Sequence, residues 1–180
     1  VVGSTCLLAL SIWLTLAFIQ ARQAGDTSEM LFTYSTPWFR PLNIAYSVGV
    51  DGISVVMLLL SAVIVFTGTF ASWQLKPLTK EYFLWFTLLS TGVFGFFICT
   101  DLFTMFMFYE VALIPMYLLI GVWGSGNKEY AAMKLTLMLM GGSALLIIGI
   151  LGIYFFSGAT TMNVNEIAAM HNIAPEVQKV

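Results

Sequence analysis

Five long apolar runs, separated by short polar segments, dominate the chain. A transmembrane helix needs about 20 apolar residues, because the hydrocarbon core is about 30 Å thick and a helix rises about 1.5 Å per residue. Length and hydropathy predict membrane spans at about 1–20, 53–73, 82–100, 102–123 and 130–156. The pattern therefore predicts an all-α fold, a polytopic transmembrane helix bundle, with residues 1–180 as one membrane-domain fragment.

The chain opens at Val1, already inside the first apolar run. Residues 1–20 lack the basic segment and the small-residue cleavage site of a signal peptide, so we interpret them as a membrane span. We expect the chain to be a piece of a longer polypeptide, cut in front of this helix and again behind His171.

The connections predict how the spans are arranged. Thr100-Asp101 alone joins the third and fourth runs, so these helices must be antiparallel neighbours. The connection 21–50 is too long for a hairpin, and its aromatic side chains suit the membrane–water interface.

Three polar residues have the character of helix N-caps. Asp51 and Asp101 each precede an apolar run, where a carboxylate can accept hydrogen bonds from free N–H groups. For both we favour capping over ion handling. Asn163-Val-Asn-Glu166 resembles a capping box, which predicts a short amphipathic helix at about 164–171 along the membrane surface.

Composition agrees with a membrane protein and narrows its chemistry. The chain is 59% hydrophobic and 9% charged, whereas soluble domains carry about 25% charged residues. A net charge of −2 without a Lys/Arg cluster argues against nucleic-acid binding. Cys6, Cys99 and His171 are too few for a disulfide framework, an iron–sulfur site, haem or zinc. We therefore expect no cofactor or metal in this chain.

The lysines predict the orientation in the membrane. Lys76 and Lys80 lie in one short loop and Lys128 lies in another, two spans later, so both loops face the same side. The longer loop on the opposite side balances its two arginines with two acidic residues. Because cytoplasmic loops carry an excess of Lys and Arg, we predict that the lysine-bearing side is cytoplasmic.

Glu110 is the most informative residue for function. It lies eight residues into the run Leu102–Trp123, about 12 Å deep at about 1.5 Å per residue. An ionised carboxylate there costs at least about 2.5–3.5 kcal/mol, so such residues are rare and usually mark a proton or ion route. Pro115 removes a backbone donor and crowds the Val111 carbonyl. The resulting kink is either ordinary for membrane helices or a way for water to reach the carboxylate.

Lys134 is the second candidate site residue. It lies little more than one turn inside the fifth run, where a lysine can extend its ammonium group to the headgroups. Alternatively, it faces the bundle interior as a proton-relay group or as a distant partner of Glu110. Its depth alone favours the headgroup interpretation.

Three segments of the chain are DLFTMFMFYEVALIPMYLLIGVWG at 101–124, EYAAMKLTLMLMGGSALLIIGIL at 129–151 and VDGISVVML at 50–58. Together they closely resemble the antiporter-like membrane subunits of respiratory complex I. The form YEVALIPMYLLIGVWG is most similar to the M subunit of bacterial NADH:quinone oxidoreductase. Tyr109 is a minor departure, since the family more often has Trp or Phe there. The family has about fourteen membrane helices, and this chain resembles helices two to six.

The resemblance implies proton translocation, coupled to NADH oxidation and quinone reduction in other subunits. In such subunits the carboxylate that matches Glu110 lies near a lysine two helices later, which is expected beyond Val180. Burial favours the neutral carboxyl group and a nearby cation favours the ionised one, so moving the cation can load or unload a proton. A lysine matching Lys134 belongs to the same channel, which shifts its interpretation toward proton relay.

The resemblance also implies partners and a location. NADH, flavin, iron–sulfur clusters and quinone would be bound by other subunits. The partners would be other membrane subunits of complex I, especially neighbouring antiporter-like subunits, within a bacterial inner (cytoplasmic) membrane.

Other functions fit the same residues. Multisubunit cation/proton antiporters and membrane-bound hydrogenases use similar subunits. A third possibility is a structural helix bundle that fills membrane area, in which case Glu110 should tolerate leucine.

Overall fold

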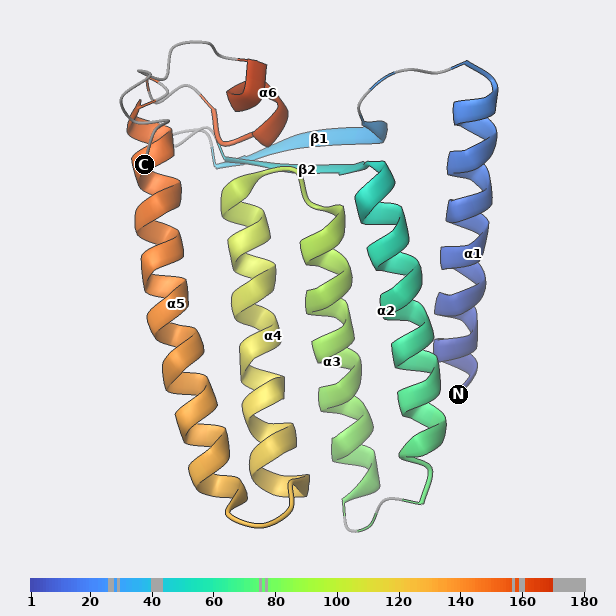
Figure 1. Ribbon diagram of the computed structural model, residues 1–180, viewed down its shortest axis with the longest axis vertical. Coiled ribbons are helices and arrows are strands. Elements are labelled where there is room, and N and C mark those ends of the chain that lie inside the picture. The colour runs from blue at the N-terminus through green and yellow to red at the C-terminus, as the bar shows by residue number, and fades with distance from the viewer. Residues whose placement is uncertain are drawn as a thin grey trace.

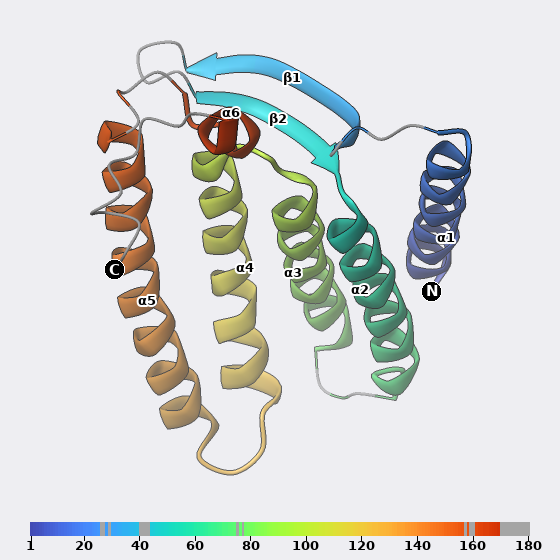
Figure 2. The ribbon, with the colours of Figure 1, turned by 45° about the horizontal axis from the view of Figure 1, so that its top comes forward.

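In the described part of the chain, five long helices stand side by side in sequence order and form one curved layer (Figure 1, Figure 2). The computed structural model describes residues 1–25, 28, 30–39, 44–74, 76, 78–156, 158 and 161–169. The long helices are α1 (Val2–Gln23), α2 (Gly52–Ala71), α3 (Thr79–Ile98), α4 (Leu102–Trp123) and α5 (Lys128–Phe156). Each is long and apolar enough to cross a membrane, and the predicted all-α membrane fold is confirmed.

Each long helix begins and ends within three residues of the span that hydropathy predicts. The short helix α6 (Val164–Ala169) begins where the sequence predicts it, while residues 170 and 171 of the predicted helix lie outside the described residues. The turn between α3 and α4 makes these helices antiparallel neighbours, as predicted (Figure 1).

The predicted capping box at α6 is half formed. Asn163 Oδ1 accepts a hydrogen bond from the Asn165 N–H at 3.0 Å, as an N-cap should. The Asn163 N–H donates to Thr161 Oγ1 at 3.1 Å, so Thr161 takes the place that the capping box gives to Glu166.

The connection between α1 and α2 contains an antiparallel strand pair. β1 (Leu31–Phe39) pairs with β2 (Ile44–Val50), with Leu31 opposite Val50 at one end. The sequence pattern predicts no strands in 21–50, so this strand pair is a feature that only the structure reveals. Its β-branched and aromatic residues favour strands, and pairing satisfies backbone groups beside the membrane. The strand ends join a buried apolar cluster with residues of α1 and α2: Phe18, Val55 and Leu58.

Backbone hydrogen bonds tie the α3–α4 turn to distant parts of the chain. The Thr100 N–H donates to the Ser47 carbonyl of β2 at 2.9 Å, and the Leu102 N–H donates to the Met162 carbonyl at 3.0 Å. The Val164 N–H donates to the Thr100 carbonyl at 2.9 Å. The strands, the turn and α6 therefore form one connected layer over the end of the bundle (Figure 2).

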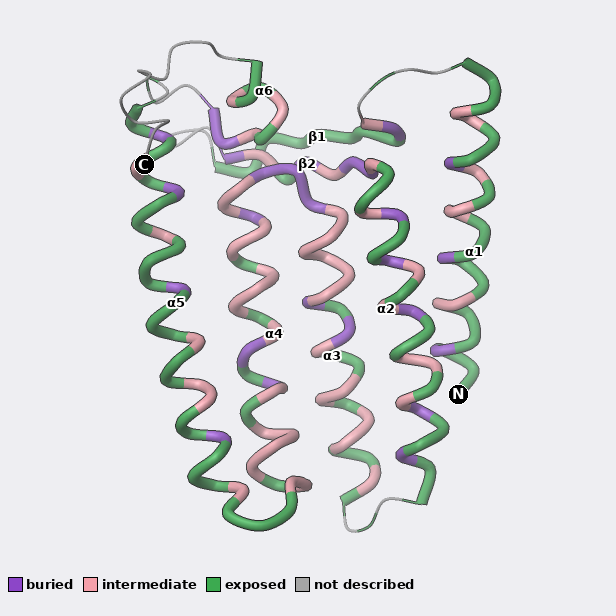
Figure 3. Tube along the Cα trace, in the orientation of Figure 1, coloured by how far each residue is buried: buried purple, intermediate pink, exposed green. Residues whose placement is uncertain are grey.

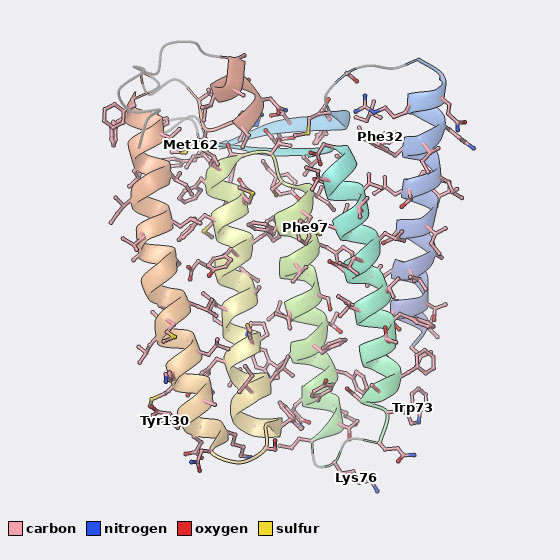
Figure 4. All side chains as sticks on the ribbon, in the orientation of Figure 1. Phe32, Trp73, Lys76, Phe97, Tyr130 and Met162 are labelled. Carbon is pink, nitrogen blue, oxygen red and sulfur yellow. The ribbon has the colours of Figure 1, made fainter. Side chains whose placement is uncertain are left out.

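The two ends of the bundle differ in character. Lys76 lies at the end away from the strands, together with Trp73 and Tyr130, whereas Phe32 and Met162 lie at the strand end (Figure 4). The α2–α3 and α4–α5 connections share the first end (Figure 1), so the lysine-bearing loops lie on one side, as predicted. The assignment of that side to the cytoplasm stays a prediction.

Most apolar side chains of the long helices are exposed in this chain. Exposed positions run along all five helices (Figure 3), and only 11–22% of the most apolar stretch of each is buried. Surfaces of this kind suit contact with lipid or with neighbouring membrane proteins. The chain therefore belongs to an integral membrane protein.

Candidate functional site

The start of α4 determines the depth of Glu110. Asp101, 1% exposed, caps α4 by accepting hydrogen bonds from the Phe103 N–H at 3.1 Å and the Thr104 N–H at 3.0 Å. Its other oxygen lies 3.4 Å from the Ala45 nitrogen of β2. Capping is thus confirmed for Asp101, and Glu110 lies about 12 Å along the helix axis from Leu102, the first residue of α4.

Asp51 has the same role at α2, where it accepts a hydrogen bond from the Ser54 N–H at 2.6 Å. Burial alone would raise the pKa of the Asp51 carboxyl, but hydrogen bonds from Ser54 and from nearby backbone N–H groups outweigh it. The pKa of Asp51 therefore lies below its ordinary value of 3.8. The capping interpretation is confirmed here too.

Two glycines of α3 bring α4 close on the side opposite Glu110. A Cβ at Gly92 would lie 2.9 Å from the Cβ of Ala112, and a Cβ at Gly95 would overlap the Phe108 ring. Residues two apart on a helix point about 200° apart, because each residue turns about 100°. Since Phe108 and Ala112 face α3, Glu110 between them faces away from α3.

Glu110 itself is half-buried, and one of its oxygens is unusual. Oε1 is buried and has no hydrogen-bond partner among the described residues. A buried polar atom left unpaired costs about 1–3 kcal/mol, and more when it is charged. Such a group inside a membrane helix is by default a functional-site candidate.

Glu110 lies in the wall of a groove between α4 and α5. The groove has a volume of about 340 Å³, which is room for about ten waters at about 30 Å³ each. Its walls are mostly apolar and carry two hydroxyl groups. The lining includes Met107, Val111, Ile114 and Tyr117 of α4 with Thr136 and Met140 of α5.

A second cavity, of about 400 Å³, adjoins this groove toward the strand end. Met107 and Val111 line both spaces, and Trp38 and Tyr46 of the strands line the second one. The two cavities together extend from the strand layer, past Glu110, toward the lysine-bearing end.

The structure does not bring Lys134 beside Glu110. Lys134 is exposed, and its Nζ lies 5.9 Å from the centroid of the Tyr130 ring. It lies two residues before Thr136, hence about 200° around α5 from the groove. It is also only about 9 Å from the start of α5, a depth from which its ammonium group can reach the headgroups. A relay role for Lys134 stays a prediction.

Pro115 is buried within α4, which continues through it as an α-helix. Proline has no N–H to donate to the Val111 carbonyl one turn earlier. Val111 lines the groove, so the weakened part of the backbone ladder lies next to Glu110.

The described residues offer few side chains that could bind a metal ion or a redox cofactor. No group of three or more His, Cys, Asp or Glu side chains could hold a metal ion there. Cys6 and Cys99 are free thiols, while His171 lies outside the described residues. Burial, with the negative charge of Asp101, raises the pKa of the Cys99 thiol to about 11, so this thiol stays protonated.

Sequence reasoning found Glu110 but missed Tyr117 and Thr136. One signal was available, since Tyr117 lies seven residues after Glu110 and so on the same helix face. Thr136 gives no such signal, because its place in the groove depends on how α5 packs against α4.

Comparison with known proteins places the chain in a family. Residues 99–179, which include Glu110, Lys134 and Thr136, match the family described as NADH:quinone oxidoreductase/Mrp antiporter, TM. The chain is similar to NADH-quinone oxidoreductase subunit M of Rhodobacter capsulatus, with 34% identity over 131 residues that cover 73% of this chain and 25% of that protein. It is also similar to NAD(P)H-quinone oxidoreductase chain 4-2 of Synechocystis, with 31% identity over 130 residues that cover 72% of this chain and 23% of that protein.

Among solved structures, the fold resembles a chain of respiratory complex I from Thermus thermophilus with bound NADH. The TM-score is 0.80 at 22% identity, over 93% of this chain and 33% of that chain. This chain spans about a quarter of the length of the two curated relatives above. The sequence match, the relatives and the shared fold together show that the chain belongs to the NADH:quinone oxidoreductase/Mrp antiporter family of membrane subunits.

Proposed function

We propose that this chain is part of an M-type, antiporter-like subunit of NADH:quinone oxidoreductase and contributes to a proton half-channel. The observation that carries the proposal is the buried, unpartnered Oε1 of Glu110 in a membrane-spanning helix. The relatives named NADH-quinone oxidoreductase subunit M and NAD(P)H-quinone oxidoreductase chain 4-2 support the choice of complex.

Glu110 holds and releases the proton in this proposal. A cation that moves toward or away from a carboxyl group changes how readily that group holds a proton. A lysine from another part of the subunit supplies that cation, and water in the groove carries the proton to and from the carboxyl group. Electron transfer elsewhere in the complex drives the movement of the cation.

Lys134 acts as a second charged group near the lysine-bearing end. It points away from the α4–α5 groove, so its partner is a group on a further helix rather than Glu110. Its closeness to the start of α5 connects the half-channel to the aqueous side.

The proposal also assigns the cofactors, the partners and the location of the chain. NADH, flavin, iron–sulfur clusters and quinone bind to other subunits, and this chain carries none of them. Its exposed apolar helices contact lipid and the neighbouring antiporter-like subunits, in a bacterial inner membrane with the lysine-bearing side in the cytoplasm.

Substitution in the assembled complex tests the proposal. We expect Glu110→Gln to lower NADH-driven proton pumping at least about tenfold, because a neutral amide cannot exchange the proton, and Lys134→Gln to lower it several-fold. Pumping is measured by dye quenching in proteoliposomes. Glu166→Gln and Lys80→Gln, which lie outside the groove, serve as controls. Wild-type pumping by Glu110→Gln in an intact complex would refute the role of Glu110.

A multisubunit cation/proton antiporter is the second candidate, because the matched family includes Mrp antiporters. Copurification with NADH-oxidising subunits supports the first proposal, whereas sodium/proton exchange without them supports the second. A purely structural bundle predicts that Glu110→Leu leaves transport intact.

A further inference from the structure

The lysine-bearing end of the groove carries two hydroxyl groups, one from each of its helices. Tyr117 of α4 is 40% exposed, and Thr136 of α5 is half-buried. Both line the groove that contains Glu110. We propose that Tyr117 relays protons between this end of the groove and Glu110, and that Thr136 orients the Tyr117 hydroxyl. The inference rests on the proposed function of Glu110.

The packing of α4 on α5 puts the two hydroxyl residues at the same level. A Cβ at Gly121 would lie 3.7 Å from the Cβ of Ala132, so these two residues face each other across the helix pair. Tyr117 lies one turn from Gly121 and Thr136 lies one turn from Ala132, each on the same helix face. Because the helices are antiparallel, both turns lead toward the strand end, which puts Tyr117 and Thr136 at the same level across the groove.

The hydrogen-bonding capacities of the two groups are complementary. The Thr136 hydroxyl donates to the Ala132 carbonyl at 2.8 Å. A threonine hydroxyl has one proton and two lone pairs, so the oxygen of Thr136 can only accept from the groove. A tyrosine hydroxyl has one proton to give and can also accept. The Thr136 oxygen can therefore accept a hydrogen bond from a groove water that in turn donates to the Tyr117 oxygen, which leaves the Tyr117 proton directed toward the Glu110 side.

The position of Tyr117 also suits transfer toward Glu110. The two residues are seven apart on one face of α4, about 10.5 Å along the axis. Long side chains on a helix lean toward its N-terminus, so the Tyr117 ring and the Glu110 side chain both lean toward the strand end and keep this separation. The remaining gap lies within a space large enough for several waters.

The transfer step leaves no charge on the phenol. Tyr117 gives its proton to a groove water on the Glu110 side, and that water passes one of its own protons through the water chain to the Glu110 carboxylate. Tyr117 then takes a proton from a water on the lysine-bearing side. The O–H bond that breaks and the O–H bond that forms are on the same oxygen, and the proton lost by the second water is replaced from the aqueous phase. The reverse sequence releases a proton from Glu110 to that side.

Conservative variants of the full-length subunit, in the assembled complex, test the inference. We expect Tyr117→Phe to lower the proton-pumping rate about three- to tenfold, the effect of one hydrogen bond lost in the transfer path. Thr136→Val should give a smaller loss, and Thr136→Ser should restore most of it. Tyr34→Phe in β1 and Thr67→Val in α2 are matched controls, because both side chains are exposed and lie outside the groove.

The rate of proton pumping is measured per assembled complex, together with the rate of NADH oxidation, so that a loss of structure is distinguished from a loss of relay. Wild-type pumping by Tyr117→Phe overturns the inference, as do equal losses in Thr136→Val and Thr136→Ser. Reduced assembly with unchanged pumping per complex also overturns it. If Glu110→Gln pumps normally, the proposed function fails; if Glu110→Gln is inactive while Tyr117→Phe is normal, only the relay fails.

Discussion

Replacing Asp101 by alanine is expected to destabilise the strand end of the bundle by about 3 kcal/mol. Loss of an N-cap costs about 1 kcal/mol, and a buried N–H that loses a charged acceptor costs about 1.5–3 kcal/mol. Asp101 accepts from the Phe103 and Thr104 N–H groups and is almost fully buried, so water cannot replace it. Asp101→Asn keeps the capping oxygen, because Asn caps as well as Asp. It should cost only about 1 kcal/mol, because its amide NH2 group cannot accept from the Ala45 N–H.

The assay is the midpoint of thermal unfolding of the purified complex, followed by tryptophan fluorescence. We expect the order wild type, Asp101→Asn, Asp101→Ala, with Asp101→Asn pumping protons at the wild-type rate. Asp51→Ala is the control, since Asp51 is less buried and should lose only about 1 kcal/mol. Wild-type stability in Asp101→Ala would refute the capping argument. Loss of pumping in a stable Asp101→Asn complex would show that the charge itself handles ions.

Two further predictions concern the α3–α4 contact and its turn. Gly92→Leu should lower the thermal midpoint by an amount equivalent to about 1–3 kcal/mol, because its Cβ would press on Ala112. Gly149→Leu, with open space around the Cβ, is the control, and equal midpoints would contradict the argument. In a Cys6→Ser background, alkylation of Cys99 at pH 8 should be about a hundredfold slower than in the denatured chain, since the pKa of this thiol is raised from 9.0 to about 11. Equal alkylation rates, measured by mass spectrometry, would contradict the raised pKa.

The long helices were predictable because few structures can cross a membrane. A run of about 20 apolar residues must satisfy its own backbone hydrogen bonds, which favours a helix. The bounds of α4 agree with the sequence at both ends, because Asp101 is a strong cap and Gly124 follows the last apolar residue.

The β1–β2 pair was not predictable in the same way. Strand propensity depends on context, and the aromatic residues of 21–50 equally suit a membrane interface. Part of what holds β2 is the Thr100 N–H, about fifty residues later in the chain. A pairing across that distance leaves no periodic signal in the local sequence.

The same distinction applies to the candidate site, where one residue could be predicted from the sequence and the others could not. Glu110 stands out in the sequence because its charge is costly at its depth. Tyr117 and Thr136 are ordinary residues for a membrane helix, and their common level across the groove depends on the Gly121–Ala132 contact. The direction in which Lys134 points likewise depends on which face of α5 packs on α4.

The hydrogen bonds that join the α3–α4 turn to β2 and to the segment before α6 also restrain the movement of α4. Sliding α4 along its axis would break the hydrogen bonds from Thr100 to Ser47, from Leu102 to Met162 and from Val164 to Thr100. Each bond contributes about 0.5–1.5 kcal/mol, so sliding α4 along its axis requires the free energy of all three bonds. Bending of α4 beyond Pro115 disturbs none of them. These hydrogen bonds to the strand layer therefore oppose sliding of α4 and help to keep Glu110 at its depth. Under the proposed function, the proton therefore moves along the groove to the Glu110 carboxyl group, and α4 does not slide to meet it.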